Sequence, residues 1–134
     1  MVSTYFIIMK KLLMLGGGFL QNFVIKKARE MGYYVFCLDA DPNALGFLSA
    51  NEHVDEEACL AYARGKNVDG VLTAATDYGV LTMSYIAQEL ELPGINYEAA
   101  KRIRNKAAVR KCLFDAKADD TGYSYEIHNV EEAE

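Results

Sequence analysis

Short continuous apolar runs, each followed by a segment with helical spacing, constrain the fold of this chain most. The runs are Lys11–Leu15, Tyr33–Leu38 and Val68–Ala75. Strands buried on both faces read as unbroken apolar runs, so these segments predict strands of a parallel sheet. The segments with helical spacing are Phe19–Met31, Asp55–Arg64 and Tyr78–Leu90. This alternation predicts an α/β fold: a Rossmann-like, open, mostly parallel sheet with helices on both faces.

The last third of the chain carries weaker signals. Leu92–Ile95 reads as a turn into a short strand, and Tyr97–Phe114 as a basic helix that breaks near Asn105. Alternating residues predict a strand over Tyr123–Asn129, and Val130–Glu134 reads as the start of a helix.

Size, charge and cysteine content bound the class of protein. The chain has 134 residues, a length that suits one domain. Its net charge of −5 argues against nucleic-acid binding. No apolar stretch approaches the roughly 18–20 residues needed to cross a bilayer. The three cysteines show no metal-ligand spacing and no disulfide pattern. Reduced thiols and a cytoplasmic location are therefore expected, with no metal site and neither nucleic-acid nor membrane partners.

The first residues stand apart from this pattern. Met9 is a candidate natural start, because the apolar stretch before it precedes Lys10-Lys11, the reverse of a secretory signal. Residues 1–9 are then an N-terminal extension or a tag remnant, and whether residues 1–8 are native stays open.

Candidate site residues follow the predicted strands, where ligands bind in open α/β sheets. They are Gly16, Gly17, Gly18, Asp39, Thr76 and Asp77. The glycines suit either an anion at a helix start or a tight turn between strand and helix. Asp39 suits either a ribose-binding acid or a solvated turn before Pro42, and Asp77 reads chiefly as a helix cap.

Nucleotide-binding fingerprints are incomplete here. If Gly16 and Gly18 begin a G-x-G-x-x-G motif, its third position holds Gln21. No Gly-Lys-Ser/Thr follows the glycines, so the P-loop pattern is missing too. Lys106 lies just after the expected helix break, where a cation could reach a phosphate.

The order of these segments resembles a known family. Four segments follow one another in the order found in the N-terminal domain of ATP-grasp enzymes. They are KKLLMLGGG, MGYYVFCLDADPNA, VDGVLTAATD and ELPGINYEAAKRIRNKAAVRKCLF. Within that superfamily the chain is most similar to carbamoyl phosphate synthase-like proteins. The resemblance covers Lys10–Ala116, and its most telling part is Leu92-Pro93-Gly94 followed by Asn105-Lys106.

The resemblance implies ATP-dependent ligation of a carboxylate to an amine through an acyl-phosphate. Lys106 would contact ATP phosphate, while the six strand-end residues would lie in loops on the substrate side. ATP and Mg²⁺ would serve the full-length parent, whose Mg²⁺ ligands lie beyond Glu134, so this fragment would itself be inactive. Expected boundaries are 10–116 for the N-terminal α/β domain and 117–134 for the start of a truncated central domain. The substrate would be a small-molecule carboxylate, and a homodimer is compatible with an apolar helix face.

Two departures from the family pattern suggest gaps in the chain. The family has a longer strand and turn where Val54 meets Asp55, and a different connection at Lys117, so residues are expected to be missing at both places. Two other functions stay open: a stand-alone Rossmann-type dinucleotide-binding module and a non-catalytic interaction domain.

Overall fold

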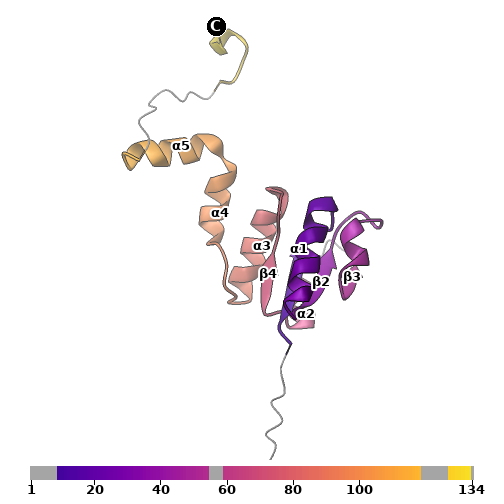
Figure 1. Cartoon of the computed structure of the whole chain (residues 1–134). Coiled ribbons are helices and arrows are strands. Elements are labelled where there is room, and N and C mark those ends of the chain that lie inside the picture. The colour runs from indigo at the N-terminus through magenta and orange to yellow at the C-terminus, as the bar shows by residue number, and fades with distance from the viewer. Residues whose placement is uncertain (1–8, 55–58, 119–126, 134) are drawn as a thin grey trace, which may run out of the picture. The chain divides into compact units, whose positions relative to one another are not determined.

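A computed structural model (Figure 1) describes residues 9–54, 59–118 and 127–133. The chain forms two compact units, Met1–Tyr97 and Glu98–Glu134, and each is considered by itself. In the part of the chain that the structure describes, no helix is long and apolar enough to cross a bilayer.

The first unit is built on a four-stranded sheet with the order β3-β2-β1-β4. Its strands are β1 (Lys11–Leu15), β2 (Tyr34–Leu38), β3 (Glu52–Val54) and β4 (Gly70–Leu72). All pairings are parallel, and Leu13 of β1 lies between Phe36 of β2 and Val71 of β4. The parallel sheet expected from the apolar runs is confirmed.

Helices cover both faces of this sheet because successive strand residues point to opposite sides. On one face Met14, Val35 and Cys37 pack against Ile25 and Ala28 of the first helix. That helix is α1 (Phe19–Glu30), and a short 3₁₀ helix, η1 (Leu45–Leu48), lies beside it.

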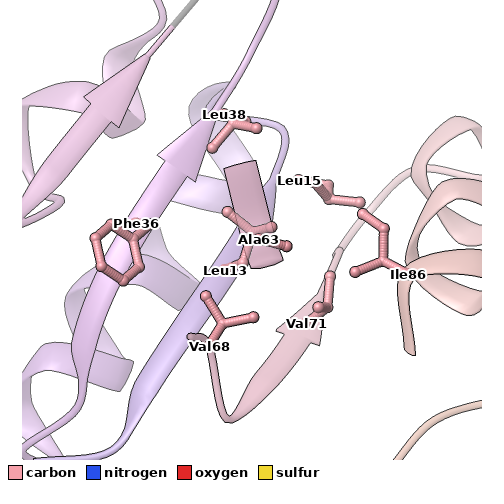
Figure 2. Packing of buried hydrophobic residues seen from close by; sticks show 8 residues of the cluster. All are labelled: Leu13, Leu15, Phe36, Leu38, Ala63, Val68, Val71 and Ile86. Carbon is pink, nitrogen blue, oxygen red and sulfur yellow. The ribbon is translucent and has the colours of Figure 1, made fainter. Parts of the chain in front are cut away.

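The opposite face carries α2 (Cys59–Lys66) and α3 (Tyr78–Glu89). Ala63 of α2 and Ile86 of α3 meet Leu13, Phe36 and other strand residues in one apolar cluster (Figure 2). The apolar run of each strand is thus divided between two cores, which accounts for the lack of polar alternation in the sequence.

The strand order creates a switch point. From β1 the chain passes through α1 to β2 and then β3 on one side, and it later returns through α2 to β4 on the other side of β1. In such sheets the connections leave β1 and β4 in opposite directions, which opens a crevice at their carboxyl ends.

Some local predictions are wrong. The structure has no strand at Ile95, which is exposed in irregular backbone. β4 is shorter than Val68–Ala75: it ends at Leu72, and the chain bends at Ala75, whose φ is +55°, before α3 begins. β3 was not predicted, since Glu52-His53-Val54 is short and largely polar.

The second unit contains most of α4 (Tyr97–Arg104), then α5 (Lys106–Asp115) and a 3₁₀ turn, η2 (Glu131–Ala133). The predicted break at Asn105 is confirmed. Asn105 has extended backbone, and its Oδ1 accepts a 3.0 Å hydrogen bond from the Ala108 N–H, so it caps α5.

Two predictions, the strand over Tyr123–Asn129 and the missing residues at Val54/Asp55 and Lys117, involve residues that the structure does not describe. Ile127 to Asn129 are not in a strand, and the rest of the predicted strand lies outside the described residues. Lys117 lies just after α5 and has a left-handed backbone conformation. Its N–H donates a hydrogen bond to the Phe114 carbonyl oxygen. Asp55 lies outside the described residues, and the expectation of missing residues at Val54/Asp55 and Lys117 stays a prediction.

Candidate functional site

A pocket of about 540 Å³ lies at the carboxyl ends of β1 and β2 and beside the loop that follows β4, within the first unit. Gly16 and Gly18, Gln21, Asp39, Thr76 and Thr82 contribute to its wall. These residues come from the β1–α1 loop, α1, the residue after β2, the β4–α3 loop and α3. The crevice that the topology predicts is therefore present, and it is wide enough for a small molecule.

The middle glycine of the loop after β1 has no room for a side chain. A Cβ atom at Gly17 would lie 3.0 Å from Cys37 Sγ and 3.1 Å from Ala44 Cβ. A Cβ atom at Gly46 would lie 2.8 Å from Gly17 Cα, and the Gly46 N–H donates to the Gly17 carbonyl oxygen at 2.6 Å. Close packing between two loops explains this glycine, as the tight-turn interpretation expects.

Gly16 serves a different purpose. Its φ of +95° lies in the left-handed region, and its N–H donates to the Leu38 carbonyl oxygen at 2.8 Å. Glycine adopts this conformation without the strain that a side chain would bring. The loop therefore turns sharply at the end of β1 and delivers Gly18 to the start of α1, where Gly18 lines the pocket.

Asp39 holds the glycine loop in place. Its Oδ2 accepts a 2.6 Å hydrogen bond from the Gly17 N–H, and its Oδ1 accepts a 2.9 Å bond from the Asp41 N–H. The second contact is the turn that the sequence suggested, whereas the first was not foreseen. The carboxylate also lines the pocket, so a role toward a ligand hydroxyl stays a prediction.

The predicted helix cap at Asp77 is wrong in its chemistry. Asp77 stands at the N-cap position of α3, but its side chain makes no capping hydrogen bond and its backbone is already helical. Thr76 Oγ1 instead accepts from the Tyr78 N–H at 3.2 Å. Thr76 lines the pocket, and the exposed Asp77 does not contribute to the wall.

Gln21 is the residue whose role the sequence did not reveal. Its side-chain Nε2 donates to the Ala74 carbonyl oxygen at 2.6 Å, so α1 is joined to the β4–α3 loop. The same loop is held at its start by Thr73, whose Oγ1 donates to the Leu15 carbonyl oxygen at 2.9 Å. The only sequence signal was that Gln21 stands where a dinucleotide motif has its third glycine.

The charge and hydroxyl groups around the pocket limit what it can bind. Among the residues that the structure describes, its wall contains one carboxylate, Asp39, the hydroxyls of Thr76, Tyr78 and Thr82, and no basic side chain. Such a wall accepts hydrogen bonds from hydroxyl or ammonium groups of a ligand. In the described residues, no group of three or more His, Cys, Asp and Glu could hold a metal ion.

The thiol behind the glycine loop is not activated. Burial, and to a smaller extent the Asp39 carboxylate, raises the pKa of Cys37 to about 12. A thiol in that state is protonated near neutral pH and is a poor nucleophile. Cys37 is also fully buried and outside the residues that line the pocket, so it offers the pocket no thiolate chemistry.

Lys106 belongs to the second unit, where it is the first residue of α5 and is exposed. Its contact with a phosphate stays a prediction. Of the residues predicted from sequence, the structure brings Gly16, Gly18, Asp39 and Thr76 around one pocket.

Comparisons with known proteins identify similar folds. No protein-family model matches the sequence, and a search of curated proteins gives no match. Phosphoribosylglycinamide synthetase from Anaerococcus prevotii is 23% identical with a TM-score of 0.76, covering 92% of this chain and 33% of that one. N5-carboxyaminoimidazole ribonucleotide synthetase from Thermotoga maritima is 21% identical with a TM-score of 0.73, covering 93% and 35%.

An L-amino acid ligase from Bacillus licheniformis is 22% identical with a TM-score of 0.64, covering 87% of this chain and 34% of that one. The chain thus spans about a third of the length of these solved structures. Identities at this level show the fold alone. They confirm the predicted α/β architecture.

Proposed function

We propose that this chain is the N-terminal, substrate-side domain of an ATP-grasp ligase, of the carbamoyl phosphate synthase-like kind, that joins a carboxylate to an amine. The observation that carries the proposal is the pocket at the switch point, which gathers Gly16, Gly18, Asp39 and Thr76. These residues come from the loops that the family resemblance assigns to the substrate side.

Two further lines of evidence support this proposal. The sequence motifs follow the order found in ATP-grasp enzymes, and the fold is similar to those of two synthetases and a ligase. Because the chain covers about a third of each neighbour, we assign catalysis to a longer parent protein. A cytoplasmic location and a homodimeric parent remain part of the proposal.

The chemistry that we propose for the parent has two steps. A carboxylate oxygen attacks the γ-phosphorus of ATP, the bond to the β-phosphate oxygen breaks, and an acyl-phosphate and ADP form. The amine then attacks the acyl carbon, the carbon–oxygen bond to phosphate breaks, and phosphate leaves with the oxygen from the carboxylate. The amine loses its proton in the same step.

This chain contributes binding and orientation to that reaction. The hydroxyls of Thr76 and Thr82 and the carboxylate of Asp39 would orient polar groups of the substrate. We assign Lys106 to an ATP phosphate. Since the described residues offer no cluster of metal ligands, we place the Mg²⁺ ligands in the rest of the parent protein.

An isotope experiment on the natural gene product that contains this chain tests the proposal. It is incubated with MgATP, ammonia or an amino acid as nucleophile, and a panel of ¹⁸O-labelled amino acids and bicarbonate. We expect one acid to support ADP formation and to transfer one ¹⁸O atom to phosphate, which shifts the ³¹P resonance. ADP formation with unlabelled phosphate for every acid would contradict the acyl-phosphate, and no acid-dependent ADP formation would contradict the ligase.

A further inference from the structure

We propose that Gln21 determines the specificity of the pocket, because its side chain covers the glycine loop and excludes a ligand diphosphate from it. Gln21 is in the first turn of α1, three residues after Gly18. In a dinucleotide-binding motif this position is the third glycine, and the glycines allow the ligand pyrophosphate to approach the backbone.

The side chain of Gln21 lies over the two glycines that such a ligand would approach. A Cβ atom built on Gly18 would be 2.9 Å from Gln21 Oε1. One built on Gly16 would be 3.6 Å from Gln21 Cγ and 3.7 Å from Nε2. The amide therefore occupies the space beside both α-carbons, and its oxygen would face phosphate oxygens in repulsion.

The nitrogen of the same amide, Nε2, is held in place by a hydrogen bond to the β4–α3 loop. Gln21 Nε2 donates to the Ala74 carbonyl oxygen at 2.6 Å, in the loop that leads to Thr76 and α3. The next residue, Ala75, has a φ of +55°, a left-handed conformation that strains a residue with a side chain. The hydrogen bond ties α1 to this strained loop, so the side chain is held over the glycines rather than free to swing away.

The pocket resembles a dinucleotide site except that the Gln21 side chain fills the space where a diphosphate would approach the glycines. Gly16, Gly18 and Asp39 stand where a Rossmann protein has its first two glycines and its ribose-binding acid. Only the third position differs in kind. The pocket beyond Gln21 retains Asp39, Thr76 and Thr82, which suits a ligand that presents hydroxyl or ammonium groups and no diphosphate.

The test compares two variants of the 134-residue chain by NADH titration, followed in amide NMR spectra. Gln21→Ala removes the cover, while Gln21→Met keeps a side chain of similar length but loses the amide, with its oxygen and its hydrogen bond to the Ala74 carbonyl oxygen. We expect Gln21→Ala to bind NADH at least about tenfold more tightly than the unmodified chain, with shifts at Gly16, Gly18 and Asp39. Gln21→Met should gain less than Gln21→Ala, because its side chain still fills space beside Gly16 and Gly18.

Two results would overturn the inference. One is a folded Gln21→Ala chain with unchanged NADH affinity. The other is an equal gain in Gln21→Met, which would assign the effect to the amide group instead of the space that the side chain fills. Should Gln21→Ala not fold, Gln21→Ser carries the same expectation, because serine is well suited to the start of a helix. The titration uses no ligation activity, so this inference and the proposed function can fail separately.

Discussion

Removing the Asp39 carboxylate should destabilise the first unit, because this side chain joins two loops that meet at the pocket. Its Oδ2 accepts from the Gly17 N–H at 2.6 Å and its Oδ1 from the Asp41 N–H at 2.9 Å. Gly17 is buried and Asp41 is exposed. In Asp39→Ala the Gly17 N–H therefore loses its partner in a place that water does not easily reach, whereas the Asp41 N–H is hydrated.

The magnitude follows from these two environments. A hydrogen bond to a charged group contributes roughly 1.5–3 kcal/mol, and a buried donor left without a partner costs about 1–3 kcal/mol. The exposed Asp41 bond adds little, so we expect Asp39→Ala to lower the free energy of unfolding by about 2–3 kcal/mol. Asp39→Asn keeps one accepting oxygen, and we expect a loss of about 1 kcal/mol.

The assay is urea unfolding of the whole chain, followed by far-ultraviolet circular dichroism because the sequence has no tryptophan. The matched control is Asp41→Ala, which loses one exposed hydrogen bond to the Asn43 N–H and should change stability by about 0.5 kcal/mol or less. An Asp39→Ala chain within about 0.5 kcal/mol of the unmodified protein, at an unchanged urea dependence, would refute this reasoning.

Three further predictions concern packing, pH and the second unit. Gly46→Ala should cost more than about 2 kcal/mol, because the new Cβ would lie 2.8 Å from backbone of Gly17; Gly65→Ala has open space and should be neutral or stabilising by up to about 1 kcal/mol. Thermal unfolding of both variants measures the difference, and equal melting temperatures for Gly46→Ala and Gly65→Ala would contradict the close packing at Gly46. The folded pKa of Cys37 is raised to about 12 from an ordinary value of 9.0, so the unfolded chain loses the proton first as pH rises. This thiol should therefore reduce stability by about 1.4 kcal/mol per pH unit between those two values, and a Cys37→Ala variant should lack that slope. Asn105→Ala should cost α5 about 1 kcal/mol of capping and speed amide exchange in its first turn, and unchanged exchange there would argue against the cap.

The apolar runs were sufficient to predict the sheet and its covering helices. Leu13 and Met14 point to opposite cores, and a run of this kind is compatible with little other than a doubly covered strand. β3 escaped prediction because its three residues carry no apolar run, and its place depends on pairing with β2. Tertiary pairing of this kind is not encoded in local spacing.

The site was only partly predictable for the same reason. Strand ends are visible in the sequence, so Gly16, Asp39 and Thr76 could be expected at one edge of the sheet. The Asp39 contact with the Gly17 N–H and the Gln21 contact with Ala74 join segments 22 and 53 residues apart. Such contacts depend on how the loops pack, which residue type and spacing do not specify.

The pocket that we assign to a substrate-side ligase domain should not act as a dinucleotide-binding site. The most direct measurement is an amide NMR titration of the unmodified chain with NADH and, separately, with MgATP. We expect no NADH binding below the millimolar range, and at most weak MgATP shifts centred on Lys106. Micromolar NADH binding with shifts at Gly16–Gly18 and Asp39 would contradict the account and make the chain a dinucleotide-binding module.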